Sequence, residues 1–234
     1  MADPFRTTRW SLILAAGGRG AVASDALSEL CQVYWRPVYI YIRRHGQAPD
    51  EAADLTQAFF LHLLEHGTFE RADPARGRFR AYIVTAARNF LLNARDHALT
   101  LRGGARTPHE SIDARDAERY LALNASDLES SPEAVFERQW ALRVTERALD
   151  RLGRDYAERG QEHLFRELRP LLTSDGPSQH SATGTGLSNE AFRTALSRAR
   201  RRFGEALRAE ILETIGNHED VEDELRHLLR VLTT

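Results

Sequence analysis

The chain has no lysine, so all 32 of its cationic residues are arginines. Arginine suits contacts with phosphate groups and guanine bases. A GC-rich genome produces the same bias, however. The lack of lysine therefore does not decide between nucleic-acid binding and genome composition.

Cysteine is almost absent as well, because Cys31 is the only one in 234 residues. A single cysteine excludes an internal disulfide. Cys31 lies among Leu30, Val33 and Tyr34 in a helix-like pattern, and the sequence places no catalytic base beside it. We therefore predict that Cys31 is a small core residue and not a nucleophile.

No apolar run approaches the length of about 18 residues that a membrane span needs. The segment Met1 to Trp10 also lacks the basic and apolar regions of a secretion signal. We expect a soluble, cytoplasmic protein that has no membrane partner. No cofactor is expected either.

The formal net charge is only −2, although 28% of the residues are charged. A protein that binds DNA tightly by itself usually has a basic body. Any contact with DNA is therefore expected to be local or assisted by a partner. The hydrophobic fraction of 42% suffices for packed cores, and the length favours two small domains over one.

Helical periodicity dominates the first hundred residues, and no useful strand pattern or internal repeat is present. The first helical stretch runs from about Thr8 to Gly46, with Ser24 as an N-cap and Gly46 as a stop. We expect two further helices, at about 50–66 and 78–101, with a loop at 70–77 between them.

The second half begins with a polar linker, at 102–131, that is expected to hold only a weak turn around 114–123. Ser131 and Pro132 then predict a helix start. Further helices are expected at about 163–172, from the cap Ser188 to 215, and at 221–232. The expected fold is all-α, with two helical domains, a flexible linker and a helix-turn-helix in the second domain.

The sequence offers three candidate binding surfaces. Between Arg78 and Arg95, arginines and asparagines alternate with aromatic residues, which fits single-stranded DNA but also a core helix with a solvated face. The helix at 50–66 has a polar face that contains an exposed leucine, which fits either a partner surface or ordinary solvent exposure. This face comprises Asp50, Asp54, Gln57, Leu61 and Glu65.

The third surface is the helix that starts at Ser188. Its apolar face carries Phe192, Leu196 and Phe203, and its opposite face is polar and basic. This layout is that of a recognition helix that enters a DNA groove. A solvated basic helix is an equally good interpretation.

Several motifs together resemble the extracytoplasmic-function (ECF) sigma factors of the sigma-70 family. They are Asp54–Phe60, Gly77–Tyr82, Ala87–Phe90 and Ser197–Phe203. The opening Phe5–Trp10 and the tail Asp223–Leu229 look like a subgroup of that family. The resemblance covers nearly the whole chain, and the order and spacing of the motifs make it specific.

The resemblance implies a promoter-specific transcription initiation factor that is not an enzyme. Its partners would be core RNA polymerase, promoter DNA and a regulator such as an anti-sigma factor or a Ser/Thr kinase. The implied domains are region 2 at 1–101, a linker at 102–131, region 4 at 132–215 and a C-terminal extension at 216–234.

The resemblance also implies roles for individual residues. Polymerase binding falls to the acidic helix: Asp50, Glu51, Asp54, Gln57 and Leu61. Binding of the minus-ten element, with a flipped base in the loop at 70–77, falls to Arg76, Arg78, Phe79, Arg80, Tyr82, Arg88, Asn89 and Asn93. Binding of the minus-thirty-five element falls to Asn189, Arg193, Thr194, Ser197, Arg198, Arg200, Arg201 and Arg202.

Some features stay open at this point. The segment Ser178–Gly186 is poor in helix formers, although the family has the first helix of its helix-turn-helix there. An interaction protein without promoter binding is therefore one alternative. A zinc enzyme is another, because His62, Glu65 and His66 match H-x-x-E-H. Thr56 is a candidate phosphorylation site, although helical geometry places it on the apolar side with Phe59.

Overall fold

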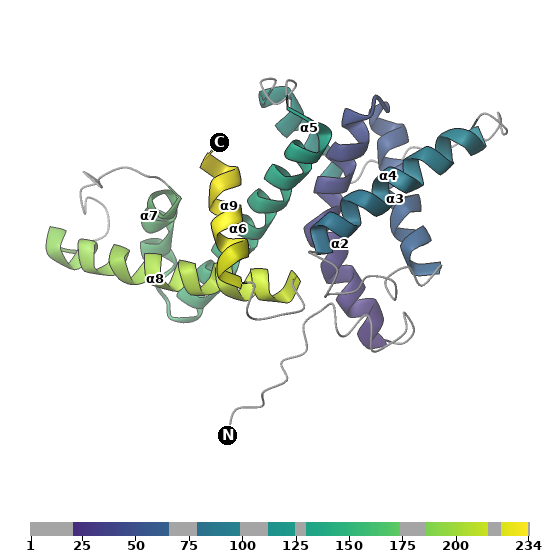
Figure 1. The fold of residues 1–234 in the computed structure, drawn as a ribbon. Helices are drawn as coiled ribbons and strands as arrows, with labels where there is room; N and C mark the ends of the chain where they lie inside the picture. Colours follow the sequence, from purple (N-terminus) through teal and green to yellow (C-terminus); the bar gives the residue numbers. More distant parts are fainter. Residues whose placement is uncertain are drawn as a thin grey trace.

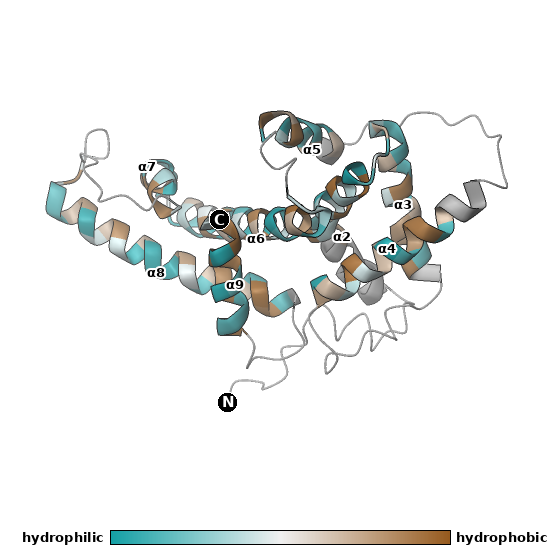
Figure 2. Ribbon diagram, turned by 45° about the horizontal axis from the view of Figure 1, so that its top comes forward, coloured by the Kyte–Doolittle hydropathy of each residue, from teal (hydrophilic) through white to brown (hydrophobic). Residues whose placement is uncertain are grey.

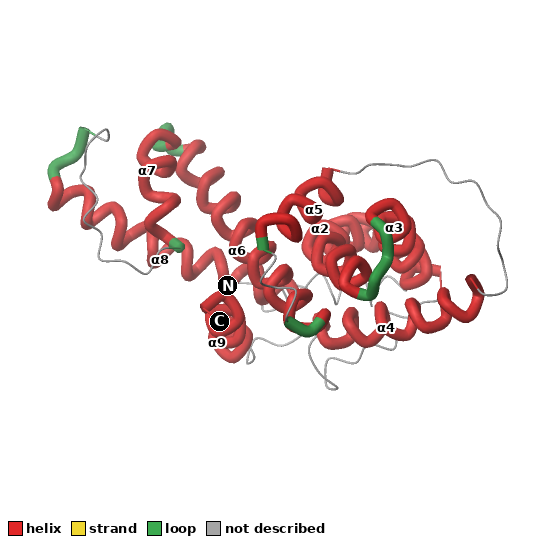
Figure 3. The backbone as a smooth tube through the Cα atoms, turned by 90° about the horizontal axis from the view of Figure 1, so that it is seen from above, coloured by secondary structure: helices red, strands yellow, loops and turns green. Residues whose placement is uncertain are grey.

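A computed structural model of the chain describes residues 21–65, 79–98, 112–124, 130–173, 186–214 and 221–233. These residues form eight helices and contain no strand, which confirms the all-α prediction (Figure 3). Across the described ranges, no helix combines the length and the apolar character that crossing a membrane requires. The expected loop at 70–77, the first twenty residues and most of the segment 178–186 lie outside the description.

Three helices form the N-terminal part: α2 (Ala21–Arg44), α3 (Pro49–Glu65) and α4 (Phe79–Ala98). They lie together at one end of the molecule (Figure 1). The turn after α2 depends on Gly46, which has a φ of 89° and donates a backbone hydrogen bond to Arg43 O at 3.0 Å. Glycine adopts this left-handed conformation without a steric cost, so the predicted stop is confirmed. Ser24, in contrast, lies inside α2 and is not its N-cap.

The helix α5 (Ile112–Leu123) lies within the segment that we expected to be a flexible linker with only a weak turn. That expectation is wrong for 112–123, because this segment is a three-turn helix packed on α2. Ala114 and Ala117 are buried, and Glu118 accepts hydrogen bonds from Arg43 Nε at 2.5 Å and from Tyr39 Oη at 2.7 Å. Contacts with residues distant in sequence therefore stabilise a helix whose local pattern is weak.

The longest helix, α6 (Pro132–Glu158), contains 27 residues and spans about 40 Å. Its start is as predicted, because Ser131 Oγ accepts a hydrogen bond from Ala134 N at 3.1 Å and Pro132 occupies the first turn. Its first half packs against α2, where Phe136 stacks on Tyr34 and meets the edge of Tyr41.

The second half of α6 packs against α7 (Glu162–Leu172) and α8 (Asn189–Thr214). Ser188 caps α8, since its Oγ accepts a hydrogen bond from Ala191 N at 3.2 Å, as expected from the sequence. The last helix, α9 (Val221–Thr233), packs on both α6 and α8. The helix α6 therefore runs from the α2–α4 end of the molecule to the α7–α8 end (Figures 1 and 3).

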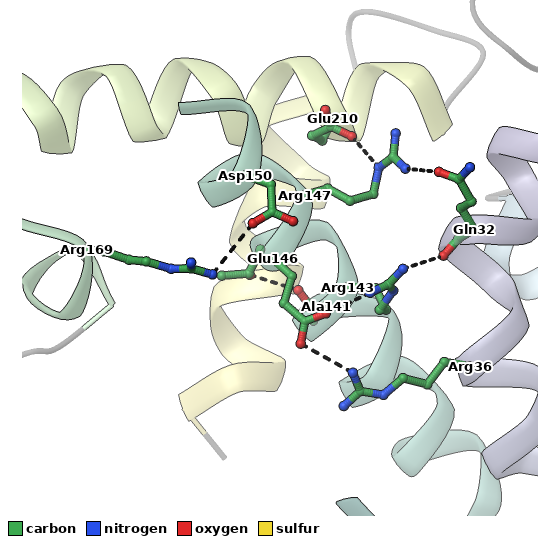
Figure 4. Close-up of polar contacts among 10 residues, drawn as sticks. Gln32, Arg36, Ala141, Arg143, Glu146, Arg147, Asp150, Arg169 and Glu210 are labelled. Carbon is green, nitrogen blue, oxygen red and sulfur yellow. Dashed lines mark hydrogen bonds and ion pairs between the residues drawn. The ribbon is translucent and has the colours of Figure 1, made fainter. Parts of the chain in front are cut away.

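Polar side chains of α6 connect the two ends of the molecule (Figure 4). Arg147 donates hydrogen bonds to Gln32 Oε1 on α2 at 3.1 Å and to Glu210 Oε2 on α8 at 2.8 Å. Arg143 donates to Gln32 O at 2.9 Å, and Glu146 pairs with Arg36 at 3.3 Å. These contacts make α6 a shared element of the N-terminal and C-terminal helices.

Candidate functional site

The helix α3 separates its apolar and acidic faces cleanly. Ala52, Phe59 and Leu63 are buried against the core. The five residues expected to contact a partner lie on the other side. Asp50, Glu51 and Gln57 are exposed, Asp54 is half-buried, and the Leu61 side chain is 56% exposed. A large apolar residue that exposed, on the same helix face as acidic residues, is typical of a protein-binding surface.

Thr56 belongs to the buried side of α3. Its exposed fraction is 0%, and its Oγ1 donates a hydrogen bond to Ala52 O at 2.6 Å. A kinase cannot reach a hydroxyl group in that position unless the helix detaches. The burial therefore argues against the candidate phosphorylation site and favours the alternative of a packed core threonine.

The helix α4 carries the residues expected at the minus-ten element, and the structure divides them. Arg88, Asn89 and Asn93 are exposed, and Tyr82 is half-buried. Phe79 is buried, with its ring edge against Tyr34 at a centroid distance of 5.3 Å. Arg76 and Arg78 lie outside the described residues. The exposed part of the expected surface therefore begins near the middle of α4.

Arg80 is the residue that departs most from the expectation. Its side chain is only 5% exposed, and it pairs with Glu224 of α9 and with Glu137 of α6, the latter at 2.6 Å. Its guanidinium group lies 4.7 Å from the Trp140 ring centre, which is a cation–π contact. In this conformation Arg80 binds acidic groups of the same chain and does not face solvent.

The two candidate surfaces of the N-terminal part lie on neighbouring helices. Phe90 of α4 packs against Phe59 and His62 of α3, with ring centres 5.7 Å apart in both cases. The acidic face of α3 and the Arg88 face of α4 therefore lie on helices that pack against each other. His66 lies outside the description, and the described residues contain no group of three side chains that could hold a metal ion.

The helix α8 has the two faces expected of it, and Figure 2 shows hydrophilic and hydrophobic residues alternating along it. Phe192, Leu196 and Phe203 are buried. The exposed face includes Asn189, Arg193, Thr194, Ser197, Arg198 and Arg201. This exposed face is rich in hydrogen-bond donors and positive charge, which suits contact with a phosphate backbone.

Two arginines of α8 make contacts within the fold. Arg200 is exposed as well, but it donates a hydrogen bond to Leu171 O, at the end of α7, at 3.3 Å. Arg202 is half-buried, and its guanidinium group lies 5.9 Å from the Tyr156 ring centre. Sequence periodicity missed this difference because the contacts come from α6 and α7.

Burial also sets the chemistry of two side chains of α2. It raises the pKa of the Cys31 thiol to about 11, so the thiol stays protonated at neutral pH, as a core residue does. It likewise raises the pKa of Tyr41 to about 12. Neither group is prepared for nucleophilic or acid–base catalysis.

Comparison with known proteins gives one match. Residues 30–98, which run from α2 through α4, match the family model for Sigma-70 region 2. No curated protein and no solved structure matches the chain. Both candidate surfaces on α3 and α4 lie within the matched segment. This match supports a place for the chain in the sigma-70 family and a role in binding RNA polymerase and melting promoters.

Proposed function

We propose that this chain is a sigma factor of the ECF type, which directs core RNA polymerase to specific promoters and helps to open the minus-ten element. The observation that carries the proposal is the pair of exposed surfaces within the region 2 match. The acidic face of α3 also contains the exposed Leu61, and the neighbouring face of α4 offers Arg88, Asn89 and Asn93.

The two surfaces suit different partners. Acidic side chains around an exposed leucine fit a basic protein surface with an apolar pocket, and we assign this face to core RNA polymerase. Arginine and asparagine side chains fit the phosphates and base edges of a separated DNA strand, and we assign this face to the minus-ten element. The nearly neutral charge of the chain fits this assignment, because the polymerase would supply most of the affinity.

We assign the second DNA contact to α8. Its exposed face carries Arg193, Arg198 and Arg201 beside Thr194 and Ser197, and its buried face is apolar. This layout supports a recognition helix for the minus-thirty-five element, in a region 4 domain that we place at 132–215. Because most of the segment 178–186 lies outside the described residues, the helix-turn-helix remains part of the proposal.

The first test inverts a charge at the centre of the α3 face. Asp54→Arg should weaken binding to core RNA polymerase at least about tenfold, because it places a positive charge among groups that we expect to meet a basic surface. Glu51→Arg, at a fully solvated position of the same face, should act in the same direction. Binding is measured by co-purification and titration.

The control for this test is Asp155→Arg, which makes the same change at an exposed position of α6. It should bind like the parent. If Asp54→Arg and Glu51→Arg are folded by circular dichroism and bind polymerase as tightly as Asp155→Arg, the assignment of the α3 face is wrong.

A further inference from the structure

The helix α9 covers one end of the α4 surface that we assign to DNA. Arg80, Val84 and Arg88 follow one another at intervals of four residues, so they form one stripe along α4. Arg88, at the far end of this stripe, is exposed, whereas Arg80 is 5% exposed. Arg80 is covered by the acidic first turn of α9, which presents Glu224 to it, and by Glu137 and Trp140 of α6.

The contact is built from charged groups on three helices. Arg80 pairs with Glu224 of α9 and with Glu137 of α6. Glu137 Oε2 also lies 2.9 Å from Nε2 of His227, which is on α9. Glu224 is completely buried, so its carboxylate depends on protein groups in place of water. The cluster therefore joins α9 to the start of α4 through charge.

Apolar contacts also hold α9 in place. Val221 and Leu228 are buried, and Leu225, Val231 and Leu232 pack partly buried against the core. On the exposed side, Arg208 of α8 pairs with Glu222 at 2.6 Å. The exposed ion pair contributes little stability, so α9 is held mainly by these apolar contacts and by the buried charged cluster.

A buried ion pair is a poor choice if the only need is stability, because apolar residues of similar volume are often at least as stabilising. It has one property that apolar residues lack: both groups regain hydration when the contact opens. Arg80 would then keep Glu137 of α6 as a carboxylate partner and have donors available on the side that Glu224 occupied, on the same stripe as Arg88. A carboxylate and a phosphate offer the guanidinium group the same kind of paired oxygen acceptors.

We propose that α9 is an intramolecular latch, in which Glu224 occupies Arg80 in place of a DNA phosphate and keeps this end of the α4 surface closed. The inference rests on the proposed function, since it assumes that the α4 surface binds a separated DNA strand. Release of α9 would uncover the side of Arg80 that Glu224 occupies and extend the surface toward the start of α4.

The test measures the affinity of the full-length chain for a labelled single-stranded DNA of random sequence, by fluorescence anisotropy. Glu224→Gln keeps the shape of the side chain and removes its charge, so it should raise the affinity about fivefold or more, the size of a typical coupling between two sites. Asp223→Asn removes the same charge from the neighbouring exposed residue, whose partner is Arg226 on α9 itself. It should bind like the parent.

Two further variants make the result specific. The double variant Arg80→Gln, Glu224→Gln should not show the rise in DNA affinity, because that rise depends on the guanidinium group of Arg80. Glu222→Gln should give a smaller gain, because it loosens α9 from α8 through an exposed pair and leaves the buried cluster intact. This variant carries the test if Glu224→Gln does not fold. Hydrogen exchange should show faster exchange in α9 and at the start of α4, with α3 and α7 unchanged.

Equal affinity for DNA in Glu224→Gln, Glu222→Gln and Asp223→Asn would overturn the latch. A gain that persists without Arg80 would overturn it as well. The proposed function is tested separately by promoter-dependent transcription with the parent chain and core polymerase. That assay can succeed while the latch fails, so the two failures are distinguishable.

Discussion

The arginines of α8 differ in what their side chains contact, and this difference gives them different roles. Arg198 and Arg201 are exposed, the latter 3.7 Å from Glu205. Arg200 and Arg202 bind groups of α7 and α6. A contact with DNA phosphate should therefore come from the first pair, and a contribution to the packing of α8 from the second.

Substitution of Arg198 and Arg200 separates these roles. Arg198→Gln should weaken binding of the chain to duplex DNA and reduce the slope of log affinity against log salt concentration by about 0.9, the value for one phosphate contact. Arg200→Gln should leave the slope nearly unchanged and lower the free energy of unfolding by about 1 kcal/mol. A salt series of binding measurements decides, and an unaltered slope for Arg198→Gln would indicate a merely solvated helix face.

At the scale of the element, α5 depends on an ionic cluster. The hydrogen bond from Arg43 is the main reason that the pKa of Glu118 lies below its ordinary value of 4.5, and Tyr39 acts in the same direction. Because the folded-state pKa is lowered, this contribution to stability is present at neutral pH. It is lost as the pH falls below the ordinary range of glutamate and through the folded-state pKa.

Glu118→Gln should therefore lower the free energy of unfolding by about 1 kcal/mol at pH 7, a value at the low end because Glu118 is partly exposed. The difference from the parent should shrink as the pH falls below about 4. Urea unfolding at a series of pH values measures both. Asp116→Asn, an exposed neighbour on α5, is the control and should have little effect at any pH. A pH-independent difference for Glu118→Gln would contradict the ionic explanation.

The elements also show what the sequence could and could not predict. The sequence correctly predicts two N-caps, at Ser131 and Ser188, and the helix stop at Gly46. Caps and turns depend on residues only a few positions apart. The prediction of Ser24 as an N-cap was wrong, because the helix α2 continues through this residue. The prediction of only a weak turn at α5 was also wrong, because the hydrogen bond that stabilises this helix comes from Arg43, 75 residues earlier in the chain.

In the candidate site, too, local features could be predicted from the sequence and contacts between distant residues could not. Periodicity separated the buried and exposed faces of α3 and α8, and it placed Thr56 with Phe59 on the apolar side. The resemblance to the sigma factors assigned Arg80 to a DNA surface, and nothing in the sequence showed that a second helix covers it. Glu224 lies 144 residues after Arg80, and no local pattern connects them.

At the scale of the whole molecule, α6 replaces the simple picture of two domains on a flexible linker. Its first half packs on α2 and its second half on α7 and α8. Figure 4 shows how Arg147 extends from α6 to Gln32 on one side and Glu210 on the other. The two-domain division from the sequence remains a prediction, but the described residues of both parts share this helix.

The contacts of Arg147 with Gln32 and Glu210 should contribute to the stability of the fold. Arg147→Met should lower the free energy of unfolding by about 2 to 3 kcal/mol, because the nearly buried Glu210 would lose its closer ionic partner and keep Arg151 at 3.4 Å. Arg154→Met, at an exposed position of the same helix, should change it by less than about 0.5 kcal/mol. Equal values for the two variants in urea unfolding would show that the bridge has no energetic role.

The most direct test of the central claim is run-off transcription with the full-length chain, core RNA polymerase from the same cells and a library of promoter fragments. If the chain is a sigma factor, transcripts should arise from a restricted set of promoters and only when the chain is present. Asp54→Arg should strongly reduce the amount of these transcripts. If the chain binds core polymerase but yields no promoter-specific transcript, it is an interaction protein of the sigma type. If it neither binds polymerase nor supports transcription, the proposed function is wrong.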